Sequence, residues 1–514
     1  MRYDFKVKSI DISAQGKYII AFHEDDAADL DVSRDDRIKV KFKRKEVTCT
    51  ANITNTFVKK GQIGLFKEVK DVLNVKNGDI VKIEPVEKPE SVRYIKKKID
   101  GYELKEKEIH SIINDIMEDN LTDIETAAFI TATSIRGMSD REIIALTRAI
   151  VKSGDTIRLK KKIVVDKHSI GGVPGNRTTL IIVPVIAAAG LTIAKTSSRS
   201  ITSPAGTADT MEVLAPVALN KRQILETVRK CNACIVWGGA VSLAAADDKI
   251  IRIEHPLKID SKPNLISSIL AKKKAVGATH CLIDISVGHG AKVRTRKEAE
   301  DLARKFIRIG KQLGIKIHCI ITPGFDPVGD AMGPALEARE ILRLYEGKPA
   351  NPEVLEKGLT MAGILLEMVG KAKKGKGYEM ARGIFESGKA YKKLKQIIKA
   401  QGGDPNIKSD DINVGSYRYV LKAGRQGRIH YMNTAVLSTA ARLAGAPHNK
   451  GAGIMLHVEK GDKIKRGQKI LTVYAESRRK LEAAKQFLKK NSPIELTRIV
   501  LEEFDEDKGL IVYT

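Results

Sequence analysis

Buried-strand patterns alternate with helical patterns in the middle of the chain, and this alternation limits the fold more than any other feature. Helical periodicity occupies residues 180–189 and 297–313. The apolar runs typical of strands lie at residues 162–166, 279–285 and 316–321, and residues 194–198 end a further expected strand. Strands that alternate with helices indicate a parallel sheet covered by helices. We therefore expect an α/β domain with a largely parallel sheet over residues 159–410.

The stretches on either side of this region predict three further domains. Residues 1–86 alternate short apolar and polar runs with turn signals, which predicts a small β-rich, barrel-like domain. Residues 87–158 have helical periodicity and two capping-box motifs, and we expect residues from about 244 to 275 to complete this helical domain. Residues 416–514 combine β-like runs, a helical run and a two-turn rhythm, which predicts an α+β domain of the hammerhead or half-barrel type.

The stretch 195–212 is dense in groups that bind anions, and it directly follows a predicted strand. Seven Ser or Thr hydroxyls fall between Thr196 and Thr207, beside Arg199 and a Pro-Ala-Gly turn, and a helix is expected to begin near Ala208. Hydroxyls, a guanidinium and free helix N-terminal N–H groups all suit phosphate oxygens. Composition alone favours a solvated surface loop, so the phosphate interpretation depends on a second motif.

That second motif is Lys167-His-Ser-Ile-Gly-Gly172, which follows another predicted strand. It offers a cation, an imidazole, a hydroxyl and two small residues that let a ligand approach the backbone. Alone it is weak, because glycine loops with a basic residue are common structural turns. Ligands of parallel sheets bind beyond the carboxyl ends of the strands. We therefore expect the two motifs to face one site.

Together the two motifs resemble the signatures of the thymidine phosphorylase family. The matching patterns are Lys167-His-Ser-x-Gly-Gly172 and Ser197-x-Arg199, followed by Gly-Thr207-x-Asp209-x-x-Glu212. The resemblance covers the chain from about Ser91 to its C-terminus, with further matching stretches at 243–247, 265–273, 284–292 and 333–340. It implies phosphorolysis, in which inorganic phosphate attacks C1′ of a nucleoside, the base leaves and a sugar 1-phosphate forms.

The resemblance also implies roles for single residues. Lys167, Ser169, Ser197 and Thr207 match the residues that hold the attacking phosphate, and Thr179 is a further candidate hydroxyl. The transition state resembles an oxocarbenium ion, so the protein has to place an oxyanion beneath the sugar and neutralise the departing base.

One segment departs from the nucleoside enzymes of the family. Where they carry a glycine-rich stretch, this chain has Ser198-Arg-Ser-Ile-Thr-Ser203, which supplies additional donors. We interpret this change as a second anion site for a 5′-phosphate on the sugar. With the additional N-terminal domain, the pattern is similar to the archaeal AMP phosphorylase branch, which implies conversion of AMP, and of CMP and UMP, to free base and ribose 1,5-bisphosphate. The alternative is a thymidine or pyrimidine-nucleoside phosphorylase that gives a sugar 1-phosphate.

The resemblance to this branch implies a set of nucleotide contacts and a proton donor to the base. The donor matches Asp260, and His168 is the rival acid; Asp260 could instead be a capping residue. Arg252 and Lys272 match base-contacting positions of the nucleoside enzymes. The expected AMP contacts are Gly172, Ser198, Arg199, Ser200, Ile201, Thr202, Ser203, Thr207, Ser268 and Lys292.

The net charge of +27, from 90 Lys and Arg against 63 Asp and Glu, attracts polyanions in general. The basic residues are spread along the whole chain and aromatic residues make up only 5%, so we expect no nucleic-acid partner. The expected partners are a nucleoside 5′-monophosphate, inorganic phosphate as co-substrate, and further copies of the chain, because the resemblance implies a homo-oligomer.

Other features argue against a cofactor, a metal site or a membrane location. Five scattered cysteines indicate reduced thiols, and the lone CxxC motif, Cys231 to Cys234, sits in an apparently helical run, which favours a structural role over metal binding. No apolar run is long enough to span a bilayer, and no signal-peptide core follows the start of the chain. We expect a cytoplasmic enzyme that uses neither metal nor cofactor.

Overall fold

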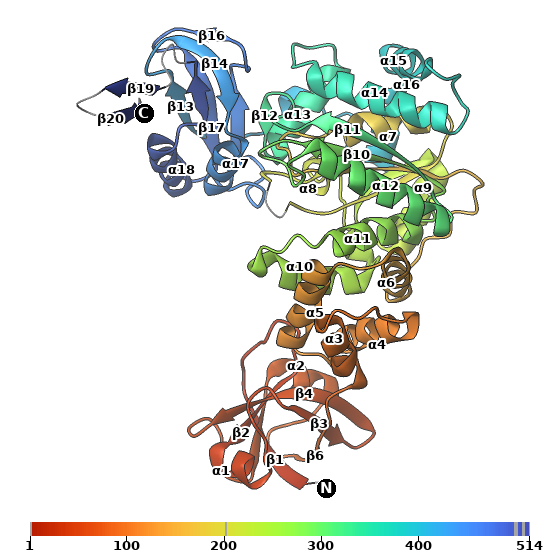
Figure 1. Ribbon diagram of the computed structural model, residues 1–514, viewed down its shortest axis with the longest axis vertical. Coiled ribbons are helices and arrows are strands. Elements are labelled where there is room, and N and C mark those ends of the chain that lie inside the picture. The colour runs from red at the N-terminus through yellow and green to blue at the C-terminus, as the bar shows by residue number, and fades with distance from the viewer. Residues whose placement is uncertain (1–2, 201–202, 498–501, 506–508, 513–514) are drawn as a thin grey trace. The chain divides into compact units, whose positions relative to one another are not determined.

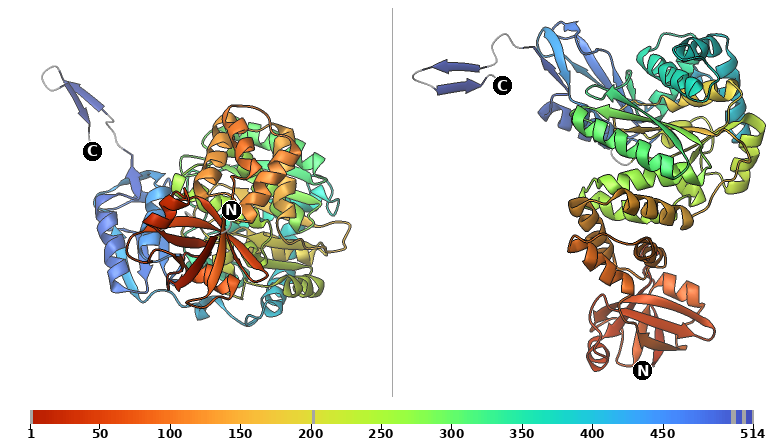
Figure 2. Two further views of the ribbon diagram at one scale, coloured as in Figure 1. Left: turned by 90° about the horizontal axis from the view of Figure 1, so that it is seen from below. Right: turned by 45° about the vertical axis from the view of Figure 1, so that its right-hand side comes forward.

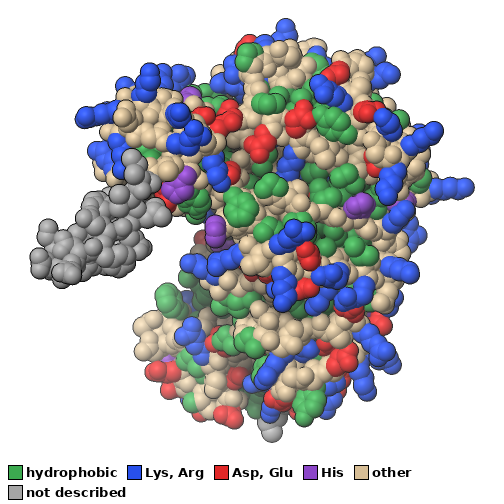
Figure 3. Space-filling model, turned by 45° about the horizontal axis from the view of Figure 1, so that its top comes forward, with side chains coloured by type: hydrophobic (Ala, Val, Ile, Leu, Met, Phe, Trp, Pro, Cys, Tyr) green, Lys and Arg blue, Asp and Glu red, His purple; other side chains and the backbone are tan. Residues whose placement is uncertain are grey.

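The computed structural model describes residues 3–200, 203–497, 502–505 and 509–512, and it separates into two compact units. The first unit combines Met1–Gly154 with Ala244–Ala271, and the second combines Asp155–Leu243 with Lys272–Thr514. The described helices include none with the length and apolar character needed to cross a membrane. On the face in Figure 3, Lys and Arg side chains are scattered among acidic and neutral ones, as expected from their spread in the sequence.

The N-terminal part of the first unit is a closed six-stranded barrel, which agrees with the predicted barrel-like domain (Figure 1). Two short helices, α1 (Glu24–Asp29) and α2 (Lys67–Leu73), accompany the strands. The Phe5 and Phe22 rings meet edge to face in the barrel core, with centroids 5.6 Å apart. In barrel order the strands are β1 (Tyr3–Ser9), β5 (Gln62–Leu65), β2 (Ile19–His23), β4 (Lys45–Thr54), β3 (Arg37–Phe42) and β6 (Ile80–Pro85).

The rest of the first unit is helical. The two predicted capping boxes are present, since the hydroxyls of Thr122 and Ser139 accept hydrogen bonds from the backbone N–H three residues later. A buried ion pair of 2.8 Å between Lys98 Nζ and Glu142 Oε1 ties two of the helices together. The helices are α3 (Glu90–Ile99), α4 (Glu106–Met117), α5 (Asp123–Arg136), α6 (Asp140–Lys152), α10 (Ala245–Leu257) and the start of α11 (Lys262–Ala275).

The second unit contains the predicted parallel strands. Strand β10 (His280–Val287) pairs in parallel with β11 (Lys316–Pro323) and β7 (Val165–Ile170). Strand β8 (Ile193–Ser197) pairs in parallel with β9 (Ala233–Trp237), and a parallel bridge from Val164 to Thr192 links the two sets. The carboxyl ends of these strands therefore share one edge.

Helices surround these strands (Figure 2). Helix α7 (Thr179–Ala188) is apolar on all sides and almost entirely buried, as its sequence predicts. The other helices are α8 (Thr207–Met211), α9 (Lys221–Cys231), α12 (Arg296–Gln312), α13 (Pro334–Tyr345), α14 (Glu353–Met368), α15 (Gly377–Glu386) and α16 (Lys389–Ala400), with short 3₁₀ turns at Gly238–Val241 and Ser409–Asp411.

Two local predictions were wrong. Lys167, His168 and Ser169 lie on β7 rather than in a loop, because the strand continues to Ile170 and only then turns at the glycines. The CxxC motif is not helical throughout: α9 ends at Cys231, and Cys234 lies on β9, where both thiols are buried and free. Asn232 adopts a left-handed conformation at the end of α9, and this residue makes the turn between helix and strand.

The C-terminal part is α+β, and the preceding domain contributes a strand to it. Strand β12 (Ala331–Met332) pairs with β15 (Gly453–Leu456), which continues through β17 (Lys469–Ala475) to β13 (Tyr417–Lys422). A second sheet contains β16 (Lys463–Ile464), β14 (Gly427–Met432) and β18 (Ile494–Leu496). Two helices, α17 (Thr434–Leu443) and α18 (Arg478–Lys490), pack beside the sheets, and the described end of the chain is the hairpin β19 (Glu502–Asp505) and β20 (Gly509–Val512).

Candidate active site

The carboxyl end of β7 holds a buried cation next to two hydroxyls. Lys167 is only 3% exposed, and its Nζ donates hydrogen bonds to Ser169 Oγ at 2.9 Å and Thr178 Oγ1 at 3.0 Å. Ser169 lies opposite Asp284 in the β7–β10 register, and its Oγ donates to Asp284 Oδ2 at 2.9 Å. The predicted lysine and hydroxyl therefore lie together at the carboxyl end of β7.

The neighbouring residue Asp166 gathers further lysines at the same strand. Its Oδ2 lies 2.6 Å from Lys273 Nζ and its Oδ1 lies 3.9 Å from Lys195 Nζ, and all three side chains are buried. Burial lowers the pKa of Lys195 to about 7 and that of Lys167 to about 8. We call Asp166, Lys167, Lys195 and Lys273 the lysine floor. Its three lysines outnumber Asp166 and the nearby carboxylate of Asp284, so the cluster favours an anion.

The segment between β7 and α7 is held by another buried cation. Arg177 is 1% exposed, and its Nη1 donates to Gly175 O at 2.6 Å and to Ala331 O at 2.9 Å; its guanidinium also contacts the Glu340 carboxylate. This arrangement fixes the start of α7, where Thr178 meets Lys167. The buried hydroxyl of Thr179 has no hydrogen-bond partner within the described part of the chain, so it is available to an anion.

The Ser/Thr-rich segment folds around a carboxylate instead of forming an open loop. Asp209 Oδ2 accepts from the backbone N–H of Ser200 at 2.7 Å and of Gly206 at 2.9 Å. A side chain at Gly206 would lie 2.8 Å from Ser198 O and from Ser200 N, so only glycine fits there. The described residues of the segment are thus tied closely to Asp209, and α8 after them has only five residues.

The Arg199 guanidinium points at acidic side chains of its own segment. It donates to Asp209 Oδ1 at 3.1 Å and to Glu212 Oε2 at 2.7 Å, and it stacks on Trp237 with 4.9 Å to the ring centroid. Lys450 of the C-terminal domain lies 2.5 Å from Glu212 Oε2. These two cations lower the pKa of Glu212 to about 2. We call Arg199, Asp209, Glu212 and Lys450 the charge-balanced turn.

Several predicted hydroxyls of this segment are directed at the backbone. Ser200 Oγ donates to Ser203 O, Ser203 Oγ donates to Ala205 O at 3.0 Å, and Ser197 Oγ donates to Ser198 O at 3.3 Å. Thr207 is half-buried as the first residue of α8. Ile201 and Thr202 lie outside the described residues. Each of these hydroxyls uses its single donor on a backbone carbonyl, so it would have to exchange that bond to donate to a phosphate oxygen.

Comparison with known proteins identifies the family. Residues 92–154 and 161–391 match the helical bundle domain and the a/b domain of a glycosyl transferase family, and residues 428–495 match the pyrimidine nucleoside phosphorylase C-terminal domain. AMP phosphorylase from Pyrococcus furiosus is 45% identical over 97% of this chain and 98% of its own length. AMP phosphorylase 1 from Archaeoglobus fulgidus is also 45% identical, over 95% of this chain and 97% of its own length, and AMP phosphorylase from Methanococcoides burtonii is 43% identical, over 98% and 99%.

This chain belongs to the AMP phosphorylase family. It is therefore an enzyme of the pentosyltransferase type. The solved structure of anthranilate phosphoribosyltransferase from Thermus thermophilus covers 60% of this chain and 98% of its own, with a TM-score of 0.51 at 20% identity, which shows a shared fold. Within the described residues, no group of three or more His, Cys, Asp or Glu side chains is placed to hold a metal ion.

Two further residues that resemblance to the AMP phosphorylase family predicts for the site belong to the first compact unit. Asp260 is exposed in the connection between α10 and α11, and Ser268 lies on α11, where its Oγ donates to Asp247 Oδ2 at 2.8 Å. Arg252 and Lys272 lie on α10 and α11. The roles of Asp260 and Ser268 in the AMP phosphorylase reaction stay predictions.

The remaining predicted residues of the second unit lie near β7. The backbone N–H of Lys292 donates to Gly171 O at 3.1 Å, so the 288–292 loop adjoins Gly172, which has a positive φ of 66°. His168 is half-buried on β7, and burial together with Lys273 and Lys195 lowers its pKa well below the usual value. Its imidazole is therefore neutral near pH 7.

Sequence reasoning missed the partners of these groups. Asp166, Lys195 and Lys273 were not assigned to the site, although Asp166 immediately precedes the first motif and Lys195 begins the second. A charged residue inside an otherwise apolar strand is the signal that could have found them, since such residues are rarely buried without a partner.

Proposed function

We propose that the chain catalyses the phosphorolysis of AMP. Inorganic phosphate attacks C1′ of the ribose, the C1′–N bond to adenine breaks, and ribose 1,5-bisphosphate and adenine form. The observation that carries this proposal is the pairing of the lysine floor with the Ser/Thr-rich turn, on the linked parallel strands β7 and β8. The relatives named AMP phosphorylase, which match almost the whole chain, support it.

In this proposal, the attacking phosphate binds to Lys167, Ser169, Ser197 and Thr207. The buried position of Lys167 supports its role, because a cation in a water-poor site stabilises negative charge more strongly than one in solvent. A bound phosphate dianion would also keep Lys167 and Lys195 protonated, against the effect of burial on their pKa. Inorganic phosphate is then a co-substrate, and we propose no further cofactor.

The nucleotide binds beside this phosphate in the same proposal. Its 5′-phosphate meets the 198–203 segment, and Gly172, Ser268 and Lys292 complete the contacts. We propose Asp260 as the proton donor to the leaving base rather than His168. The lowered pKa of His168 leaves little of its protonated form near pH 7, and the resemblance to the AMP phosphorylase branch supports Asp260. CMP and UMP are further proposed substrates.

Product analysis after incubation with AMP and inorganic phosphate tests the function. We expect adenine and ribose 1,5-bisphosphate in equal amounts, and neither product without phosphate. Adenosine and thymidine serve as comparison substrates: faster turnover of either nucleoside than of AMP would favour the pyrimidine-nucleoside phosphorylase alternative. Asp260→Asn and His168→Asn separate the two acids, because only the loss of the proton donor should remove the basic limb of the kcat profile against pH.

A further inference from the structure

A cavity adjoins the Ser/Thr-rich turn on the side of the C-terminal domain. It has a volume of about 480 Å³ and is lined by Ser200 from the turn and by residues of α17, α18 and the loop between α17 and β15. Three of the lining side chains are basic and exposed: Arg442, His448 and Lys480. The chemistry of the lining therefore suits an anion in contact with Ser200.

The loop that carries His448 is fixed against both domains. Asn449 N donates to Gly445 O at 2.9 Å, and the Asn449 side chain donates to Glu476 Oε2 at 2.8 Å. The next residue, Lys450, forms the 2.5 Å contact with Glu212 of the charge-balanced turn. The loop that carries His448 is therefore held beside the turn by hydrogen bonds and an ion pair, without help from a ligand.

The cations of the turn are already paired with carboxylates, so a phosphate bound there requires positive charge from other residues. Arg199 is matched by Asp209 and Glu212, and Glu212 is shared with Lys450. A phosphate dianion at Ser200 would therefore lie close to two carboxylates. Lys480 Nζ, in contrast, donates to the neutral amide oxygen of Asn449, so its positive charge is not compensated by that partner.

We propose that this cavity holds the 5′-phosphate of the nucleotide, and that Lys480, Arg442 and His448 make the C-terminal domain a determinant of specificity for nucleoside monophosphates over nucleosides. The inference rests on the proposed function for the identity of the nucleotide. It assigns the two phosphates of the reaction to different cations: the attacking phosphate to the buried Lys167, and the 5′-phosphate to exposed groups of the C-terminal domain.

Equilibrium binding of AMP, adenosine and inorganic phosphate to the full chain tests this inference without depending on turnover. Lys480→Met and the double variant Lys480→Met with Arg442→Met should weaken AMP binding by about ten-fold and about a hundred-fold, because each removes a charge-assisted contact. Binding of adenosine and of inorganic phosphate should change by less than about two-fold.

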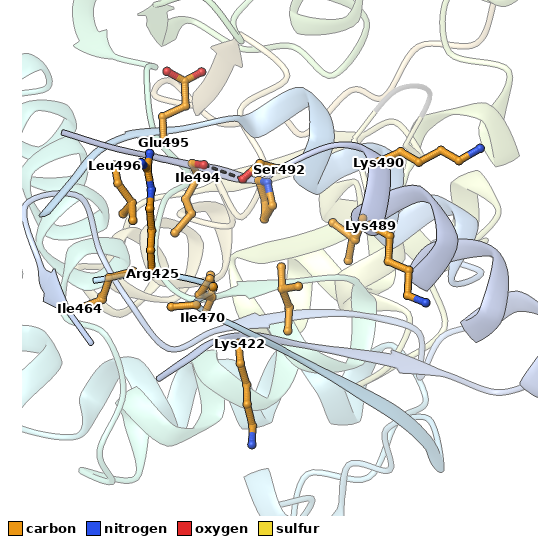
Figure 4. Close-up of a pocket in the computed structure, with 15 residues that line it drawn as sticks. Lys422, Arg425, Ile464, Ile470, Lys489, Lys490, Ser492, Ile494, Glu495 and Leu496 are labelled. Carbon is orange, nitrogen blue, oxygen red and sulfur yellow. Dashed lines mark hydrogen bonds between the residues drawn. The ribbon is translucent and has the colours of Figure 1, made fainter. Parts of the chain in front are cut away.

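Lys490→Met is the matched control, since Lys490 is exposed on the same helix α18 but lines a different cavity of the C-terminal domain, of about 520 Å³ (Figure 4). It should leave AMP binding unchanged. Unchanged AMP binding in both test variants, or an equal loss for AMP, adenosine and phosphate, would overturn the inference. If the double variant does not fold, the single exposed substitution decides. Wild-type chain that binds AMP but releases no adenine from it would refute the proposed function alone.

Discussion

The lysine floor at β7 and the charge-balanced turn after β8 lie in the same candidate site but differ in the burial and the balance of their charges. In the floor, Lys195 and Lys273 lie beside the Asp166 carboxylate, Lys167 is the next residue of the strand, and all four side chains are buried. In the turn, Arg199 and Lys450 meet two carboxylates, and the side chains of Arg199 and Glu212 are 34% and 27% exposed. Coulomb interactions are far stronger in the first environment than in the second. The lysine floor therefore attracts an anion by its buried positive charge, whereas the charge-balanced turn contributes through its backbone conformation.

The largest expected effect concerns the scaffold of the floor. Arg177→Met should lower the free energy of unfolding by about 3–5 kcal/mol, because Glu340 would remain buried without its guanidinium partner. Urea denaturation measures the change. Arg222→Met is the control: Arg222 forms an exposed pair with Glu226 on α9, and its loss should cost less than about 1 kcal/mol. Equal losses of unfolding free energy in the two variants would show that the buried Arg177–Glu340 pair matters no more for stability than the exposed Arg222–Glu226 pair.

The next effect concerns the catalytic contribution of the floor. Lys167→Met should reduce kcat/KM for inorganic phosphate by about 10²–10³-fold, because it removes the buried cation that holds the attacking phosphate dianion in the proposed mechanism. Initial rates at varied phosphate and saturating AMP measure it. A loss of less than about ten-fold in kcat/KM for inorganic phosphate would indicate that the charge-balanced turn, and not the lysine floor, binds the attacking phosphate.

The pH dependence of stability tests whether the floor holds a desolvated lysine. The pKa of Lys195 is about 7 in the folded chain, below its usual 10.5. Between these values the unfolded chain binds more protons, so this group adds to the free energy of unfolding as the pH rises, by at most about 1.4 kcal/mol per pH unit. Below pH 7 Lys195 is protonated in both the folded and the unfolded chain, so its contribution to the free energy of unfolding no longer changes with pH.

Lys195→Met should therefore lose this pH-dependent contribution. The difference in unfolding free energy, wild type minus variant, should rise in urea denaturation from pH 7 to pH 9. Curves that stay parallel over this range would mean that Lys195 titrates normally.

The same contrast explains which parts of the site could be predicted from the sequence. The order of strands and helices follows from local periodicity, and the motifs at Lys167 and Arg199 follow from residue type and spacing. Both could therefore be predicted from the sequence. The partners of Ser169 and Asp166 could not: Asp284 on β10 and Lys273 on α11 lie more than a hundred residues away in the sequence. Only the register of the sheet and the packing of α11 bring them close.

Arg199 shows a different limit. Its partners Asp209 and Glu212 belong to the same motif, so their proximity was foreseeable. A guanidinium in a Ser/Thr-rich stretch suits phosphate and carboxylate equally well, however, and residue type does not distinguish between them. The backbone turn around Asp209 decides the outcome, because it directs Arg199 toward Glu212.

The smallest expected effect is therefore in the turn. Glu212→Gln removes a carboxylate from the neighbourhood of the proposed 5′-phosphate and releases Arg199 and Lys450 from it. Stability should change by no more than about 1 kcal/mol, because the pairs are partly exposed. AMP binding should strengthen by about two- to five-fold, while inorganic phosphate, held at the floor, should bind as before. Calorimetric titration of both ligands measures the two changes, and weaker AMP binding would mean that Glu212 orients Arg199 for the nucleotide instead of competing for it.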